Sequence, residues 1–147
     1  MIQTITTNSE EETASVGRQL AARLSAGDVL LLYGDLGAGK TAFVRGLAEG
    51  LGVSRDEVSS PTFTLIQEYR GGGLPLFHVD LYRIDDPREF DELGLDQIAE
   101  GGVLAIEWAE KLAGGAGVDA AAVDRIVSIR IAHGDGDART IEVVTAF

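Results

Sequence analysis

The sequence contains no cysteine and only 3 prolines among its 147 residues. Without cysteine the chain can form no disulfide and no thiolate metal site, and it has no cysteine nucleophile. This composition suits a reducing compartment, so we expect a cytoplasmic location. Residues 1–14 lack the basic and apolar regions of a signal peptide, and no apolar run approaches the roughly 20 residues that a membrane helix needs.

Basic residues are also scarce, since 12 Lys and Arg stand against 24 Asp and Glu, for a net charge of −12. A field of this sign repels nucleic-acid phosphates over a Debye length of roughly 8 Å at physiological salt. We therefore expect no autonomous binding to nucleic acid, and the lack of a long apolar run leads us to expect no membrane association. With 45% apolar residues the chain can bury one core of ordinary size, so residues 1–147 are expected to form a single domain.

Apolar patterning predicts an α/β fold whose sheet is mixed, mainly parallel and flanked by helices. A buried run at 29–33 precedes a glycine loop and then a helix-spaced segment over 43–51. A capping box at Ser9 predicts a helix over about 10–25. Other strands are predicted over 2–6, 62–69, 74–80, 103–106, 125–132 and 139–145, with antiparallel hairpins at 62–80 and 125–145. A short helix after Asp86, a helical turn over 108–112 and a loop over 113–122 complete the predicted elements.

Residues 34–41 read Gly-Asp-Leu-Gly-Ala-Gly-Lys-Thr and satisfy the phosphate-loop (Walker A) pattern G-x-x-x-x-G-K-[ST]. Glycines let backbone N–H groups turn around phosphate oxygens, and the helix that follows presents free N–H groups to the same anion. Lys40 is expected to reach the β- and γ-phosphates, and the Thr41 hydroxyl is expected to ligate Mg²⁺. The remaining loop residues expected to bind nucleotide are Asp35, Leu36, Gly37, Ala38 and Gly39.

A phosphate loop also needs a carboxylate at the end of a neighbouring strand, which holds Mg²⁺ directly or through water. Asp80 and Glu107 each close a buried apolar run, so both are candidate metal ligands and, with Lys40, candidate catalytic residues. Thr62 either contacts Mg²⁺ or the γ-phosphate, or simply begins a strand after a Ser-Pro turn.

Other residue types point less clearly to a function. His78 and His133 are not at metal-ligand spacing, and we interpret both as structural. Trp108, the only tryptophan, is either a core residue or part of an interface. No Asn-Lys-x-Asp or Thr-Lys-x-Asp string is present, which disfavours a guanine-specific GTPase.

The sequence resembles the TsaE (YjeE) family of small P-loop ATPases that serve bacterial tRNA threonylcarbamoyladenosine synthesis. The resemblance covers nearly the whole chain and rests on GDLGAGKT, SSPTFTLIQEY at 59–69, HVDLYR at 78–83 and IEWAEK at 106–111. It implies an ATPase that binds a TsaB–TsaD pair, in which TsaD modifies adenosine in tRNAs reading ANN codons, so that this chain meets tRNA only through its partners.

The resemblance also implies roles for particular residues. Thr41 and Glu107 would hold Mg²⁺, and Asp80 would be the acid needed for hydrolysis. Adenine would lie between the segment near Glu10 and the last hairpin near Ala138 and Arg139.

Two other functions stay open from the sequence. One is a nucleotide-gated interaction module in which hydrolysis is incidental, and the other is a small-molecule kinase. The segments after Asp80 are short and contain no evident arginine-rich lid, which disfavours the kinase.

Overall fold

The computed structural model describes residues 2–34, 39–53, 66–70, 72–81, 94, 100–109 and 125–145. The elements, in chain order, are β1 (Ile2–Thr7), α1 (Glu10–Ala21), β2 (Asp28–Tyr33), α2 (Lys40–Gly50), β3 (Ile66–Tyr69), β4 (Leu76–Asp80), β5 (Val103–Glu107), β6 (Arg125–His133) and β7 (Arg139–Val144). Within these residues, no helix has the length and apolar character needed to cross a membrane. The helix predicted after Asp86 and the loop predicted over 113–122 lie outside the described residues, apart from residue 94.

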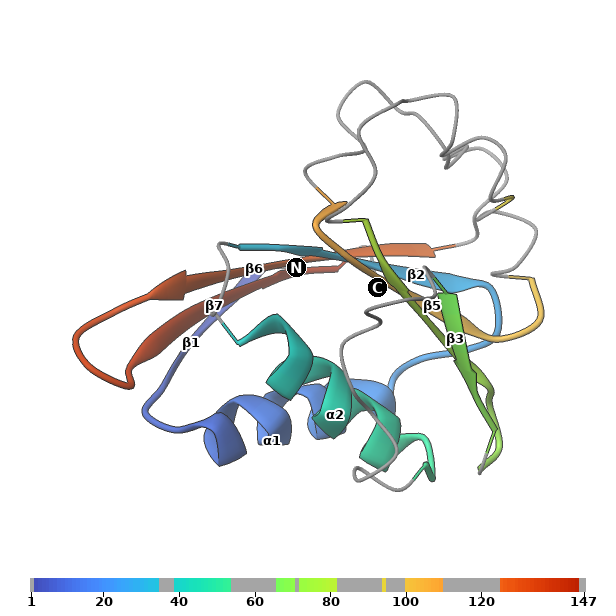
Figure 1. Ribbon diagram of the computed structural model, residues 1–147, viewed down its shortest axis with the longest axis horizontal. Coiled ribbons are helices and arrows are strands. Elements are labelled where there is room, and N and C mark those ends of the chain that lie inside the picture. Colours follow the sequence, from blue (N-terminus) through green and yellow to red (C-terminus); the bar gives the residue numbers. More distant parts are fainter. Residues whose placement is uncertain are drawn as a thin grey trace.

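The strands form one seven-stranded sheet in the order β1-β7-β6-β2-β5-β4-β3. At its centre, β2 pairs in parallel with β5 and β6, and β4 pairs in parallel with β5. The edges are antiparallel, through the hairpins β3–β4 and β6–β7 and the pair β1–β7. Both helices lie on the same face of the sheet (Figure 1). The predicted mixed α/β sheet is therefore confirmed, with its parallel strands at the centre.

The two helices pack so closely that glycine is required where they meet. A Cβ on Gly46 would lie 1.7 Å from the Ala14 carbonyl oxygen, and one on Gly17 would lie 2.3 Å from the Phe43 carbonyl oxygen. The core between the helices and the sheet includes Leu30, Leu32, Phe43, Val44 and Leu47, all fully buried. This packing fixes the N-terminal end of α2 above the central parallel strands.

One predicted boundary is wrong. α1 ends at Ala21, earlier than the predicted end near residue 25, because the N–H groups of Arg23 and Leu24 donate to carbonyl groups only three residues back. Leu24 stays buried outside the helix, which explains why the apolar spacing continued past its end. The helical turn predicted over 108–112 is described only at Trp108, whose φ is 61°, and at Ala109, because residues 110–112 lie outside the described residues.

Candidate functional site

The two helices begin in opposite ways. Ser9 caps α1 by accepting a hydrogen bond from the Glu12 N–H at 3.1 Å, and three glutamates lie in the first turn. In contrast, α2 follows Gly39, whose φ is 107°, and has neither a side-chain cap nor an acidic residue in its first turn. The first N–H groups of a helix have no partner within it and carry partial positive charge. The start of α2 is therefore suited to bind an anion.

Lys40 lies at this end of α2 with its side chain only 4% exposed. Its ammonium donates a hydrogen bond to the Gly34 carbonyl oxygen at 2.6 Å and lies 3.5 Å from the centre of the Trp108 ring. Trp108 adopts a left-handed backbone conformation that is rare for a bulky residue and costs of order 1 to 3 kcal/mol. In this conformation the indole ring packs against Lys40, the lysine of the phosphate-loop sequence.

Thr41 lies where the carboxyl ends of β4 and β5 meet. Asp80 and Glu107 are partners in the register of these two parallel strands, so their side chains leave the sheet on the same face. The Thr41 hydroxyl donates a hydrogen bond to Glu107 Oε1 at 3.3 Å. Glu107 is only 3% exposed, whereas Asp80 is partly buried. The structure thus brings together the three residues predicted from the sequence to bind metal.

These oxygen atoms fit a Mg²⁺ ion. Magnesium prefers an octahedron of oxygens at about 2.1 Å, in which neighbouring ligands lie roughly 3.0 Å apart. The 3.3 Å between Thr41 Oγ1 and Glu107 Oε1 is close to that spacing. In the part of the chain that the structure describes, no three His, Cys, Asp or Glu side chains form a group able to hold a metal. A site that uses few carboxylates together with substrate phosphates and water is typical of Mg²⁺.

His78 contacts one of the predicted metal ligands, a contact that the interpretation of His78 as a structural residue did not include. Its side chain is fully buried, and its Nε2 atom hydrogen-bonds to Glu107 Oε2. The signal was present in the HVD string, because residues two apart on a strand share a face and His78 therefore shares one with Asp80. His133, in contrast, lies exposed at the end of β6.

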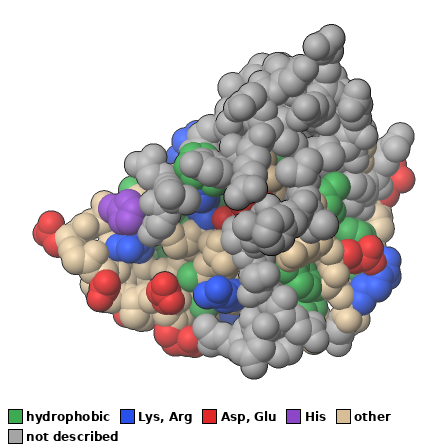
Figure 2. All heavy atoms as spheres, in the orientation of Figure 1, with side chains coloured by type: hydrophobic (Ala, Val, Ile, Leu, Met, Phe, Trp, Pro, Cys, Tyr) green, Lys and Arg blue, Asp and Glu red, His purple; other side chains and the backbone are tan. Residues whose placement is uncertain are grey.

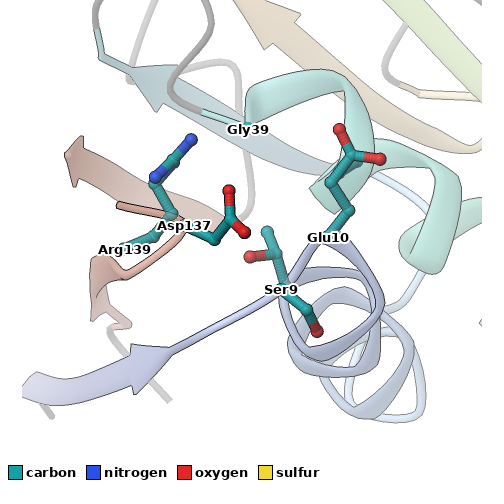
Figure 3. A pocket seen from close by; sticks show the side chains of 7 residues that line it. Ser9, Glu10, Gly39, Asp137 and Arg139 are labelled. Atoms are coloured by element: carbon teal, nitrogen blue, oxygen red, sulfur yellow. The ribbon is translucent and has the colours of Figure 1, made fainter. Parts of the chain in front are cut away.

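A pocket of about 240 Å³ opens beside the start of α2 (Figure 3). The starts of both helices and the end of the β6–β7 hairpin line it, through Ser9, Glu10, Thr13, Gly39, Ala42, Asp137 and Arg139. Figure 3 shows Asp137 and Arg139 on one side of this pocket and Ser9 and Glu10 on the other. Ala138 is not among the lining residues. Its backbone instead closes the hairpin turn, through hydrogen bonds with Gly134 and Asp135.

Several residues predicted to belong to the site lie outside the described part of the chain. They are Asp35, Leu36, Gly37, Ala38 and Thr62. Their predicted contacts with nucleotide or metal stay predictions, as do the ligand contacts of the residues that the structure does place.

A phosphate-loop sequence joins a central parallel strand to a helix with an uncapped N-terminus, and that helix contacts a carboxylate at a strand end. These features define a P-loop NTPase-like α/β protein. Comparison with protein families narrows the class further. The chain belongs to the TsaE family, because its residues 7–141 match the family model described as "Threonylcarbamoyl adenosine biosynthesis protein TsaE". This confirms the resemblance seen in the sequence.

Similar proteins carry the description "tRNA threonylcarbamoyladenosine biosynthesis protein TsaE". The one from Bacillus subtilis (strain 168) is 55% identical over 100 residues, and the one from Nostoc sp. (strain PCC 7120) is 48% identical over 108 residues. These matches cover 67% and 70% of this chain but 61% and 65% of the relatives, so the chain spans less than two thirds of their lengths. A crystal structure of Bacillus subtilis YdiB is similar with a TM-score of 0.77 and 36% identity, covering 100% of this chain and 87% of the other.

The position of Trp108 predicts a modest role in stability. A fully buried aromatic residue truncated to alanine typically costs about 3 to 5 kcal/mol. Trp108 is only partly buried, and its contact with the buried Lys40 ammonium is of the kind that contributes roughly 1 to 2 kcal/mol. Trp108→Ala should therefore lower the free energy of unfolding by about 1 to 2 kcal/mol in a urea titration, and Trp108→Phe should lower it less. A loss above 3 kcal/mol would instead identify a core residue.

Proposed function

We propose that this protein binds and hydrolyses ATP with Mg²⁺, and that it serves tRNA threonylcarbamoyladenosine biosynthesis together with a TsaB–TsaD-type pair. Membership of the TsaE family supports the pathway. The single observation that carries the chemistry is the hydrogen bond from Thr41 to the buried Glu107 at the uncapped start of α2. It joins an anion-binding helix end to an oxygen set that suits Mg²⁺.

In this proposal the chain binds the phosphates through its backbone and one cation. The free N–H groups at the start of α2 bind phosphate oxygens, and Lys40 exchanges its contact with the Gly34 carbonyl for the β- and γ-phosphates. Thr41 and Glu107 would hold Mg²⁺, which when bound neutralises charge on the phosphate oxygens. Trp108 borders the same lysine, so a contact of its ring with a partner protein would be linked to nucleotide occupancy.

Asp80 orients the attacking water in this mechanism. Its carboxylate lies beside Glu107 at the strand ends and can accept a proton from that water. The water oxygen forms a bond to the γ-phosphorus as the bond to the β-phosphate oxygen breaks, so that ADP leaves. The proton then passes to the released phosphate or to solvent.

The pocket beside Gly39 is the proposed site of the adenosine moiety. It adjoins the helix end where the phosphates would bind, so one nucleotide can occupy both. Glu10 and Asp137 provide carboxylate acceptors for the amino group of adenine or the hydroxyls of ribose, and Arg139 provides a cation. In this proposal Glu10 and Arg139, which the resemblance assigned to the adenine site, line the pocket, whereas Ala138 contributes through the shape of the turn.

The charge of the molecule supports an indirect relation to tRNA. Its net charge is −12, and on the face seen in Figure 2 the acidic and basic side chains of the described residues are interspersed. Such a surface does not attract a phosphate backbone. The proposal therefore assigns contact with tRNA to the partner proteins.

Asp80→Asn tests hydrolysis as the function. The variant should keep its affinity for ATP within about threefold but release phosphate at least ~100-fold more slowly with the partners present, because the general base is lost. Modification of tRNA by the reconstituted system should fall in parallel. Glu68→Gln, the same loss of charge on an exposed side chain of β3, is the matched control.

Two results would contradict the proposal. If Asp80→Asn lost hydrolysis but still supported tRNA modification, the protein would act as a nucleotide-gated module. If the wild-type protein released phosphate only after a small-molecule acceptor was added, it would be a kinase.

A further inference from the structure

We propose that His78 is a positioning residue that makes Glu107 a one-oxygen ligand and thereby favours Mg²⁺ over Ca²⁺. The inference rests on the proposed function, because it concerns the metal that accompanies the nucleotide. Glu107 has two carboxylate oxygens with different partners: Oε1 accepts a hydrogen bond from the Thr41 hydroxyl, and Oε2 hydrogen-bonds to His78 Nε2. The histidine therefore determines which oxygen faces the helix end.

The direction of the bond follows from the chemistry of the two groups. An ionised carboxylate can only accept hydrogen bonds, so Nε2 of the imidazole is the donor. With both side chains almost fully buried, water does not compete for Oε2, and the bond holds the carboxylate in one orientation. A residue that hydrogen-bonds to a metal ligand without touching the metal holds that ligand in the orientation that binds the metal.

The surroundings of His78 favour this role over a purely structural one. Its neighbours on β4, Leu76, Phe77 and Val79, are buried apolar residues, and burial of a polar ring among them is costly unless it is hydrogen-bonded. In the described part of the chain, Nδ1 has no hydrogen-bond partner. Polar anchoring of the ring thus comes from Glu107, and the nearby Tyr69 ring lies 6.5 Å away between centroids.

The choice of metal follows from the number of oxygens that Glu107 can offer. Calcium takes six to eight oxygen ligands and often binds a carboxylate through both oxygens, whereas Mg²⁺ requires a near-ideal octahedron. A hydrogen bond to Oε2 opposes two-oxygen binding but leaves Oε1 available beside Thr41. Loss of the Nε2 donor should therefore weaken Mg²⁺ binding and make the site discriminate less against Ca²⁺.

Two amide substitutions test this idea. The amide nitrogen of His78→Gln reaches about as far along the side chain as Nε2 and can donate to Glu107, whereas that of His78→Asn reaches only as far as Nδ1. Affinity for a non-hydrolysable ATP analogue is measured by calorimetry with excess Mg²⁺, with excess Ca²⁺ and with EDTA. Mg²⁺ should raise the affinity of His78→Asn for the analogue about tenfold less than it raises that of the wild type. The affinities measured with Ca²⁺ or with EDTA should differ little between the two proteins. His78→Gln should stay within about threefold of the wild type under all three conditions.

The outcomes separate this inference from the proposed function. If the wild-type protein gained no affinity from Mg²⁺, the proposed function itself would fail. If the wild type gained affinity and His78→Asn gained as much, or lost affinity equally under all three conditions, only the positioning role would be overturned.

Nitrogen-15 spectra of wild-type His78 with Mg²⁺ and the analogue bound give a check that does not depend on folding of the variants. The ring proton should stay on Nε2. A proton on Nδ1 alone would overturn the inference.

Discussion

Replacing Lys40 with alanine should lower the affinity for MgATP roughly 100-fold or more. Hydrogen bonds to charged groups contribute about 1.5 to 3 kcal/mol each, and each 1.4 kcal/mol corresponds to a tenfold change in affinity. The Lys40 ammonium is buried at the start of α2, where the β- and γ-phosphates are proposed to bind. Its removal leaves those phosphates with backbone N–H groups but without the adjacent cation.

Calorimetric titration with MgATP measures the effect of Lys40→Ala. Arg70→Ala removes an exposed cation at the β3–β4 hairpin and should leave the affinity unchanged. Because Lys40 also contacts Gly34 and Trp108, a thermal melt of Lys40→Ala must show that the variant is folded at the titration temperature. A folded Lys40→Ala protein with wild-type affinity would disprove the phosphate-loop assignment.

Glu107→Gln should slow ATP hydrolysis at least ~100-fold and raise the Mg²⁺ concentration needed for half-maximal rate. A neutral amide is a much weaker ligand for Mg²⁺ than a carboxylate, and metal stabilisation of transition-state charge contributes several kcal/mol to such reactions. The substitution preserves the size of a side chain that is 3% exposed, so the fold should tolerate it.

Phosphate release across a range of Mg²⁺ concentrations, with partners present, measures this second effect. Glu68→Gln again serves as the control, since its carboxylate is exposed on β3. If phosphate release by Glu107→Gln depended on Mg²⁺ as it does in the wild type, Glu107 would not be the metal ligand. Asp80 would then be the first candidate for that role.

Features that depend on short stretches of sequence were predictable. The buried run at β2, the glycine loop and the amphipathic start of α2 each have a local pattern, and both hairpins formed where turn residues separate strand-like runs. Asp80 and Glu107 could be placed together because parallel strands bring their carboxyl ends to one edge. The sequence could not show that these two residues are direct partners in register.

Features that depend on contacts between distant segments were not predictable. The end of α1 was misplaced because Leu24 is buried by tertiary packing rather than as part of the helix. The contact of His78 with Glu107 depends on the pairing of β4 with β5. The contact of Trp108 with Lys40 depends on a left-handed backbone conformation at Trp108, which a sequence predicts readily only at glycine. The need for glycine at position 46 likewise appears only once α1 packs against it.

The most direct test of the central claim is a crystal structure with Mn²⁺ in place of Mg²⁺ and a non-hydrolysable ATP analogue, with the metal located by its anomalous scattering. The metal should lie within roughly 2.5 Å of both Thr41 Oγ1 and Glu107 Oε1, with Asp80 no farther away than one bridging water. The triphosphate should lie at the start of α2, and the adenosine should lie in the pocket between Glu10 and Arg139. A bound nucleotide whose metal contacts neither Thr41 nor Glu107 would rule out the proposed Mg²⁺ site.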